Sequence, residues 1–378
     1  MSSDSIVIVS GARTPMGGFQ GDLTGATAPQ LGATAIKAAV ERAGVNAEEI
    51  DEVIMGCILT AGIGRGPTRQ AMRNAGIPDS TGAITINKLC GSGLKAVMQA
   101  HDSIKAGSAD IIVASGMESM TNAPYILPQA RGGYRMGHNA VKDHMFLDGL
   151  EDADTGKLMG QFAQEMADEK GYTREQMDDF AIESLNRALT AINEGHFKDE
   201  ITPVTVKTRK GEVVIDTDEQ PAKANAERIP TLRPAFAKEG TITAANASSI
   251  SDGAAAVVVT SEKTANEKGL NIEARIVATA TNSLHPSKFT IAPIGSMEKV
   301  LEKAGWSVED VDLWEINEAF AMVTMAAMDE MNIPHAKVNI EGGACALGHP
   351  VGCSGARILV TLINSLKRTG GKKGVASL

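Results

Sequence analysis

The stretch Thr85–Ala96 reads TINKLCGSGLKA, and in it a cysteine stands between an alternating apolar run and a Gly-Ser-Gly turn. The run predicts a strand and the residues after the turn predict a helix, which places Cys90 at or near the N-terminus of that helix. Free N–H groups and the helix dipole favour a thiolate there, and they could hold an oxyanion. Position alone leaves a second interpretation open, because most unpaired cysteines are simply buried.

Outside this stretch, short apolar runs alternate with amphipathic helical windows, which indicates layers of α-helices and β-strands. The runs that we expect to form buried strands are SIVIVSG (5–11), EVIMGCIL (52–59), DIIVASG (110–116) and AAAVVVT (254–260). Residues 120–250 differ, since they are rich in charges and contain a helical pattern from Thr173 to Asn193. Thr173 and Gln176 form a capping box, and Gly195 ends the helix. This part is interpreted as an insertion over a site built elsewhere.

A faint internal repeat relates the two ends of the chain. Residues 41–56 (ERAGVNAEEIDEVIMG) align with residues 302–317 (EKAGWSVEDVDLWEIN), an offset of 261. Residues 92–116 align with residues 354–378 at an offset of 262, and both segments begin with Ser-Gly. Two blocks at nearly one offset predict a duplicated α/β unit.

Composition narrows the class of protein. With 378 residues the chain should form two or three packed units, and its net charge of -10 argues against a nucleic-acid partner or a membrane-binding basic patch. No apolar block approaches the roughly 18 residues of a transmembrane helix, and no signal peptide is recognised. The four cysteines form no C-x-x-C pair, so we expect a cytoplasmic protein without a disulfide framework or zinc ribbon.

A second stretch, residues 339–358 (NIEGGACALGHPVGCSGARI), holds His349 in a glycine-dense turn ahead of a predicted helix. In the repeat this turn corresponds to the loop of Cys90, so His349 is a candidate base toward that thiol. The alternative is a loop histidine bonded to carbonyl groups. Cys345 and Cys353 are interpreted as packing residues.

A third stretch, residues 313–321 (LWEINEAFA), predicts a strand that ends at Asn317 and a helix that starts with Ala319 and Phe320. Asn317 could hold a water molecule or a carbonyl oxygen. Its other interpretation is a helix cap, which needs no catalysis.

Together these stretches resemble the thiolases, the acyl-CoA:acetyl-CoA acyltransferases, and the resemblance runs in order over the whole chain. The segments that carry it are GARTPMGGFQG, NKLCGSGLKA, ASSISDGAAAVVV, NEAFA and GGACALGHPVGCSGARI. The resemblance implies a thiolase-like duplicated α/β/α/β/α layered fold with an inserted loop domain. We expect an N-terminal domain at 1–119, completed by 251–271, a loop domain at 120–250 that covers the site and binds coenzyme A, and a C-terminal domain at 272–378.

The resemblance also implies roles for individual residues. Cys90 attacks a thioester carbonyl, His349 takes its proton, and a water molecule held by Asn317 helps to stabilise an oxyanion. The positions implied to contact substrate or coenzyme A are Ser248, Met159, Leu150, Phe236, Ala319 and Phe320. Acetyl-CoA, acetoacetyl-CoA and CoA are the implied substrates and products, with no separate cofactor and no metal. Members of the family assemble as homodimers or homotetramers.

Three departures from the family pattern are visible. Leu158 stands where bacterial biosynthetic members often have histidine, and Pro221 stands where some relatives have an arginine near the adenine, a role that Lys223 could share. In the family, the last strand of this sequence continues into a Cys-x-Gly-Gly-Gly segment, whose cysteine is the second acid/base. The sequence given ends at Leu378, one residue before that cysteine, and we expect a sequence cut short.

The leading prediction is an acetyl-CoA C-acetyltransferase that condenses two acetyl-CoA through an acyl-cysteine. The alternatives are a medium- or long-chain 3-ketoacyl-CoA thiolase of β-oxidation and a catalytically impaired, thiolase-like CoA-binding protein. A decarboxylating condensing enzyme shares the nucleophilic cysteine, but the NEAF and GHPVG segments fit it less well.

Overall fold

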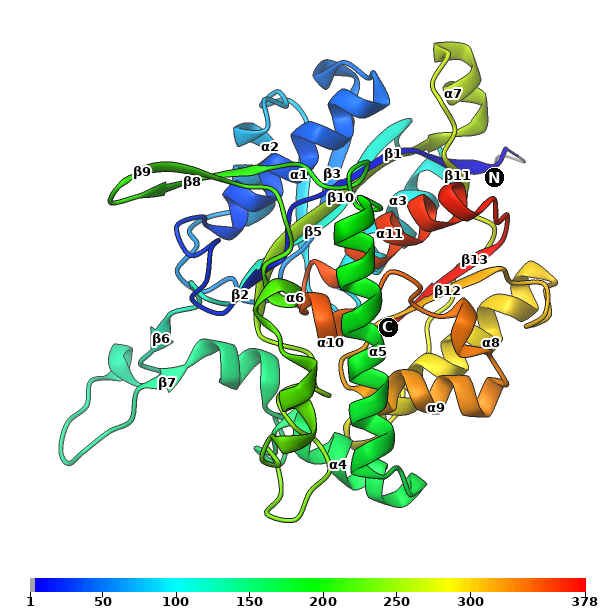
Figure 1. Ribbon diagram of the computed structural model, residues 1–378. Helices are drawn as coiled ribbons and strands as arrows, with labels where there is room; N and C mark the ends of the chain where they lie inside the picture. The colour runs from blue at the N-terminus through cyan, green and yellow to red at the C-terminus, as the bar shows by residue number, and fades with distance from the viewer. Residues whose placement is uncertain (1–3) are drawn as a thin grey trace.

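The computed structural model describes residues 4–378 and is organised around a seven-stranded mixed sheet (Figure 1). The strand order is β11-β1-β10-β5-β3-β4, and β2 pairs with β10. Strands β3, β4 and β5 are parallel, whereas β10 runs antiparallel to both β5 and β1. The strands are β1 (Ile6–Arg13), β2 (Gly17–Gly18), β3 (Glu52–Gly56), β4 (Gly82–Ile86), β5 (Ile111–Ser119), β10 (Ser251–Ser261) and β11 (Ala274–Arg275).

Alternating side chains of this sheet enter two different cores. On one face Val53, Val113 and Val258 pack with α1 (Ala28–Ala43) and α2 (Pro67–Asn74). On the other face, residues of the same strands pack with α3 (Ser92–Lys105) and α11 (Ser354–Thr369). Because both faces are covered, β5 and β10 are buried along almost their whole length, as their continuous apolar runs predict.

A second, smaller sheet lies beyond α3 and α11. It consists of the parallel strands β12 (Leu313–Ile316) and β13 (Gly374–Ser377). Trp314, Ile316 and Val375 pack with the helices on its far side, α8 (Ala292–Ala304) and α9 (Ala321–Met331). The molecule therefore has α/β/α/β/α layers, and the predicted fold is confirmed.

The duplication is visible in the strand register. Glu52 of β3 lies opposite Ile112 of β5, and Leu313 of β12 lies opposite Gly374 of β13. These pairs are related by the two offsets that the sequence repeat contains. The repeat therefore marks equivalent strand–helix–strand units in the two halves.

Residues 120–250 form an irregular layer around one side of the molecule. The predicted long helix is α5 (Arg174–Glu194), with Thr173 as its N-cap, the capping box to Gln176 and Gly195 in the left-handed conformation at its end. The other elements of this part are β6 (Tyr125–Ile126), β7 (Lys142–Asp143), a π-helical turn (Phe146–Leu150), α4 (Met159–Lys170), β8 (Val204–Thr208), β9 (Gly211–Ile215) and α6 (Glu219–Lys223). Short elements elsewhere include α7 (Glu262–Lys268) and α10 (Ala344–Leu347).

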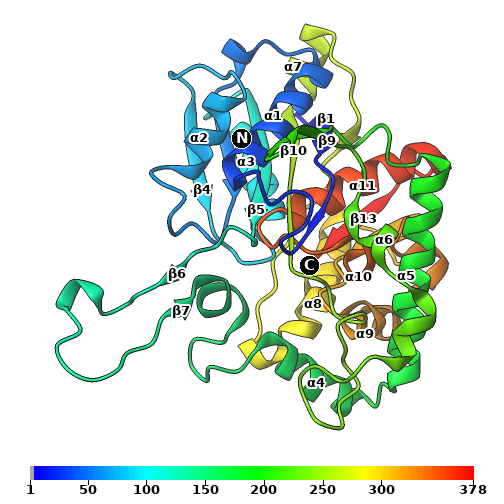
Figure 2. The ribbon, with the colours of Figure 1, turned by 60° about the vertical axis from the view of Figure 1, so that its left-hand side comes forward.

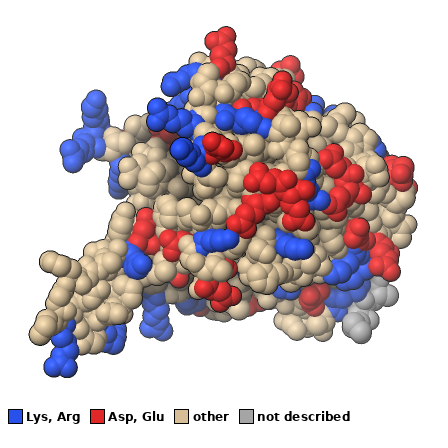
Figure 3. Space-filling view, turned by 90° about the horizontal axis from the view of Figure 1, so that it is seen from below, with Lys and Arg blue, Asp and Glu red and all other residues tan. Residues whose placement is uncertain are grey.

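An arm around β6 and β7 projects from the body of the molecule (Figure 2). Seen from below, it extends at the lower left of Figure 3 and its surface is largely uncharged, while acidic and basic side chains are intermixed elsewhere on that face. Large apolar side chains on the arm are exposed, among them Tyr125 at 69% and Met136 at 96%. Such exposure of apolar side chains is typical of a surface that contacts another protein.

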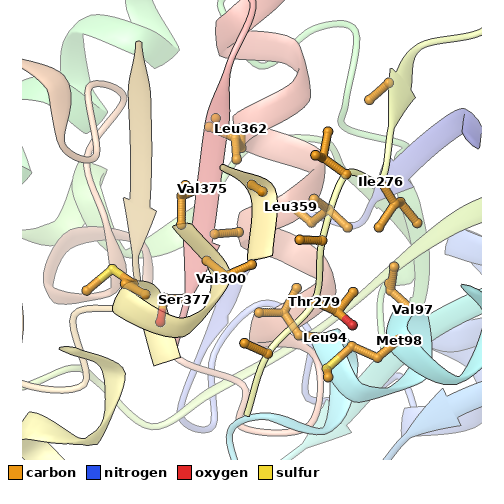
Figure 4. Close-up of a pocket in the computed structure, with 18 of the residues that line it drawn as sticks. Leu94, Val97, Met98, Ile276, Thr279, Val300, Leu359, Leu362, Val375 and Ser377 are labelled. Atoms are coloured by element: carbon orange, nitrogen blue, oxygen red, sulfur yellow. The ribbon is translucent and has the colours of Figure 1, made fainter. Parts of the chain in front are cut away.

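A cavity of about 610 Å³ lies beside β13, which pairs only with β12 in the described part of the chain. Figure 4 shows Val375 and Ser377 on one side of it and Ile276 and Thr279 on the other. The cavity extends to Gly91, the N-cap of α3. The C-terminal sheet thus has an unpaired edge next to the residues that follow Cys90.

Candidate active site

Cys90 lies immediately before the N-cap of α3, as the sequence predicts. Leu89 has a φ of 49°, which turns the chain sharply, and the Ser92 hydroxyl stabilises this turn by donating to Leu89 O at 2.6 Å and accepting from Lys88 N at 2.8 Å. The cysteine packs against a buried cluster whose members are Ile58, Leu59, Met120, Met145 and Val351. The nucleophile candidate therefore sits at a fixed, mostly apolar position.

Burial of Cys90 opposes the thiolate form that its place at a helix terminus favours. Burial raises the pKa of this thiol to about 11, since desolvation disfavours the charged form. Its own backbone N–H lowers the pKa, while the charge of Glu118 raises it further. Desolvation thus outweighs the lowering of the Cys90 pKa by the helix terminus. The thiol therefore needs a base when it attacks.

The first turns of α3 and α11 touch through a pair of glycines. A β-carbon on Gly93 would lie 2.5 Å from Ala356 N, and one on Gly355 would lie 2.4 Å from Leu94 N. Only glycine permits this approach at either position. The two glycines are equivalent in the repeat, and their contact places the segment before α11, which carries His349, beside the segment that carries Cys90.

His349 is buried, and its ring is held on both sides. Nδ1 lies 2.5 Å from Ser354 Oγ, Ser354 Oγ donates to Pro350 O at 3.1 Å, and Asn317 Nδ2 lies 3.5 Å from Nε2. Because the amide of Asn317 can only donate through Nδ2, Nε2 is the acceptor and Nδ1 carries the proton. Burial lowers the pKa of His349 to about 3, with a further contribution from Arg357. The ring is neutral, with a basic nitrogen turned toward Asn317.

Asn317 directly follows β12, and its backbone N–H donates to Ser377 O at 3.0 Å. It is not a helix cap, because α9 begins at Ala321 with Phe320 as its N-cap; the predicted start at Ala319 and Phe320 is wrong by one to two residues. The Oδ1 atom of Asn317 is buried and has no hydrogen-bond partner among residues 4–378. A buried unpaired oxygen next to His349 is a place for a donor such as water.

The remaining predicted positions fall into contacting groups. Leu150 packs against the cluster that holds Cys90. Ser248 N donates to Ala319 O at 3.0 Å. The rings of Phe236 and Phe320 meet edge to face at 6.1 Å.

The segment 247–251 links these groups. Ser249 O accepts from His349 N at 3.2 Å, and Ile250 packs against the cluster that holds Cys90. Met159 begins α4, next to Gly160, whose Cα faces the Phe236 ring. The segment 247–251 thus contacts the His349 loop, the cluster that holds Cys90 and the segment of Ala319 and Phe320.

Sequence reasoning missed two residues that touch this region. Ser354 holds the His349 ring, and Glu118 accepts hydrogen bonds from the loops on either side of Cys90. A signal for Ser354 was present, since the repeat pairs it with Ser92, which organises the Cys90 turn. Lys223, for which a role toward adenine is predicted, forms ion pairs with Glu219 and Asp22 in this structure.

Comparison with known proteins identifies the family. The family model described as "Thiolase, N-terminal domain" matches residues 6–263, and "Thiolase, C-terminal domain" matches residues 270–378. The chain belongs to the thiolase family. Acetyl-CoA acetyltransferases from Pseudomonas aeruginosa and Cupriavidus necator are 48% and 50% identical to it over 375 residues, which cover 99% of this chain and 95% of each relative.

Solved thiolase structures agree with this assignment. The acetyl-CoA acetyltransferase of Bacillus anthracis is 42% identical with a TM-score of 0.96, over 99% of this chain and 95% of the other. The Acat5 thiolase from Ascaris suum, solved in complex with coenzyme A, is 40% identical with a TM-score of 0.91, over 96% of this chain and 93% of the other. The protein is therefore an acyltransferase of the thiolase type. In this structure the Asn317 amide faces the His349 ring, and Cys90 packs against a cluster that includes Val351, two residues from His349.

Proposed function

We propose that the protein is an acetyl-CoA C-acetyltransferase, which condenses two acetyl-CoA into acetoacetyl-CoA and CoA and also runs the reverse thiolysis. The observations that support this proposal are that Asn317 faces His349 in the interior of a thiolase fold and that Cys90 packs beside Val351 of the His349 loop. The relatives named as acetyl-CoA acetyltransferases support the choice of substrate.

In the first half-reaction, the sulfur of Cys90 attacks the thioester carbon of acetyl-CoA while its proton passes to His349 Nε2. The carbonyl oxygen becomes an oxyanion, and a water molecule bound at Asn317 together with His349 would donate to it. Collapse of this intermediate breaks the bond to the CoA sulfur, and the proton on His349 leaves with it as CoA-SH. Acetyl-Cys90 and free CoA are the products.

In the second half-reaction, a base removes a methyl proton from another acetyl-CoA, and the resulting carbanion attacks acetyl-Cys90. The carbon–sulfur bond breaks, and the thiolate of Cys90 recovers a proton. The family resemblance assigns the base to the cysteine of the family's Cys-x-Gly-Gly-Gly segment. Coenzyme A takes part as a portion of the substrates, and the proposal includes no separate cofactor.

The packing of the aromatic rings around Phe320 supports a short acyl chain as the substrate, since the resemblance places Phe236 and Phe320 beside the acyl or pantetheine group. Phe320 contacts Phe236 at 6.1 Å and Phe289 at 6.3 Å, both edge to face. A β-carbon on Gly160 would lie 2.2 Å from the Phe236 ring, so this ring has little room to turn away. The relatives named as acetyl-CoA acetyltransferases support the same choice of a short acyl chain.

Acetylation of Cys90 tests the proposal directly. Incubation with acetyl-CoA followed by peptide mass spectrometry should show one acetyl group on Cys90, and the variant Cys90→Ala should show none. Variants of Cys353, a buried cysteine that is not part of the mechanism, serve as the matched control and should keep the label on Cys90. An unlabelled wild-type protein, or faster turnover of a C8 ketoacyl-CoA than of acetoacetyl-CoA, would contradict the proposal.

We also propose a homodimer or homotetramer in the cytoplasm. The sheet edge at β4 exposes Ile84 at 44%, and Leu89 beside the nucleophile is exposed at 54%. The apolar arm supplies a second surface for self-association. All four cysteines are unpaired, which suits a reducing compartment, and no helix within residues 4–378 is long and apolar enough to cross a bilayer. Light scattering of the purified protein checks the number of subunits.

A further inference from the structure

Glu118, near the end of β5, is a fully buried carboxylate that the mechanism above does not use. Its Oε2 accepts from Gly352 N at 2.9 Å and from Ile58 N at 3.1 Å. Its Oε1 accepts from Leu59 N at 3.0 Å, and Cys57 Sγ lies 3.6 Å from the same oxygen. Within the described chain its partners are backbone N–H groups and a thiol, without a cation.

The two loops that Glu118 joins lie on either side of the candidate nucleophile. Ile58 and Leu59 belong to the loop after β3, and Val351 belongs to the loop between His349 and α11. All three are members of the cluster against which Cys90 packs. A change in the distance between these loops would therefore change the distance between the imidazole and the thiol.

The loop of His349 packs against two glycines, Gly56 at the end of β3 and Gly116 within β5. Gly56 and Gly116 are register partners, and a β-carbon on either would lie within 2.8 Å of Gly352 O. A β-carbon on Gly352 itself would lie 2.7 Å from Glu118 Oε2. The backbone of the loop thus rests directly on the sheet, and the carboxylate is its polar attachment there.

The three N–H donors require that both side-chain oxygens of residue 118 accept hydrogen bonds. An ionised carboxylate accepts on every lone pair, whereas a glutamine would turn an NH₂ group toward N–H donors that also need an acceptor. Three N–H donors that point at the two oxygens favour the carboxylate form of Glu118 against the desolvation that opposes it. A residue that only filled space would not need these three hydrogen bonds.

We propose that Glu118 is a positioning residue for acyl transfer: its carboxylate fastens the His349 loop to the loop after β3 and so sets the place of His349 relative to Cys90. This inference rests on the function proposed above. Glu118 touches no substrate and acts through the two loops.

The charge of Glu118 gives the proposal a distinctive readout. Its negative charge raises the pKa of Cys90, so removal of the charge should lower that pKa. The carboxyl of Glu118 itself has its pKa raised to about 7 by desolvation, which the three N–H groups oppose. The other titratable groups on segments packed around Cys90 are Cys57, His144, Asp148, Cys353 and His349, of which His144 and Asp148 are bonded to each other.

The experiment compares Glu118→Gln and Glu118→Asp in the full chain. For each variant we measure the rate of Cys90 acetylation by acetyl-CoA and the pH midpoint of Cys90 alkylation by iodoacetamide. For Glu118→Gln we expect acetylation to slow by about 10²-fold, the cost of a misplaced catalytic group, and the alkylation midpoint to fall. Glu118→Asp keeps the charge but is shorter, so it should slow acetylation and leave the midpoint near that of wild type.

Glu200→Gln is the matched control. Glu200 is also a buried carboxylate, but it bonds to Arg13 and Thr361, so its variant should lower the melting temperature without moving the alkylation midpoint. A Glu118→Gln protein that folds and keeps either the wild-type acetylation rate or the wild-type midpoint would overturn the proposal. If that variant does not fold, Glu118→Asp decides: a wild-type acetylation rate overturns the proposal, and a reduced rate with native melting supports it.

The design also separates this inference from the function on which it rests. If the wild-type protein is not acetylated by acetyl-CoA, the proposed function fails. Alkylation by iodoacetamide needs no acyl-CoA, and an unmoved midpoint in Glu118→Gln would then still overturn the role of Glu118.

Discussion

Replacement of Ser354 by alanine should slow acyl transfer because it alters which nitrogen of His349 carries the proton. In the protein, Nδ1–H donates to Ser354 Oγ, so the lone pair that takes the proton of Cys90 is the one on Nε2, which faces Asn317 Nδ2. Ser354→Ala leaves that N–H buried without a partner in the reactive tautomer, which costs about 1–3 kcal/mol. At roughly 1.4 kcal/mol for each factor of ten, the population of the reactive tautomer falls by about 5- to 150-fold.

Rapid-quench mass spectrometry of acetyl-Cys90 measures this effect on the first half-reaction alone. Ser115→Ala is the matched control, since the Ser115 hydroxyl is also buried and donates to Ile54 O at 3.2 Å, but it does not touch His349. We expect the two variants to lose similar stability and only Ser354→Ala to lose rate. Wild-type acetylation by a folded Ser354→Ala protein would refute the tautomer assignment, and with it the reasoning that makes Nε2 the base.

Strands and the duplication could be predicted because their signals are local. The continuous apolar runs of β5 and β10 follow from burial on both faces of the large sheet, and the capping box of α5 is contained within four residues. The repeat is also visible without any knowledge of packing, and the matched registers of the two sheets follow from it.

The protonation states of the candidate site could not be predicted in the same way. Cys90 precedes a helix N-terminus, which by itself favours a thiolate. The groups that reverse this effect are Glu118 and the apolar residues around Met120 and Val351, which lie far away in the sequence. Desolvation depends on everything that surrounds a group, and no short motif records it.

Asn317 illustrates the limit of motif reading at a single position. A polar residue between a strand and a helix suits a helix cap and a catalytic amide equally well. What decides is that α9 begins four residues later and that Nδ2 points to His349, from a different part of the chain. The start of α9 depends on Ala321 N, which donates to Asn246 O in the inserted layer.

Three further predictions concern the pocket wall and the buried charges. Phe236→Ala should raise turnover of a C8 ketoacyl-CoA relative to acetoacetyl-CoA, because it removes an aromatic contact with Phe320 worth about 0.5–1.5 kcal/mol and makes room for a longer acyl chain. An unchanged ratio of the two turnovers would place Phe236 outside the acyl pocket. Since folding lowers the pKa of His349 from 6.5 to about 3, its neutral ring contributes stability that is full above pH 6.5 and lost as the pH falls toward 3. His349→Gln should therefore flatten the acid side of the melting-temperature profile, and an identical profile would count against this pKa. Arg13→Ala should lower the unfolding free energy by about 3–5 kcal/mol at pH 8, because it strands the buried carboxylates of Glu200 and Asp218 without their partner. Protonation removes the charge of the two unpaired carboxylates, so the loss of unfolding free energy, measured by urea denaturation, should be smaller at pH 5. An equal loss at both pH values would mean that the fold requires the packing of the arginine rather than its charge.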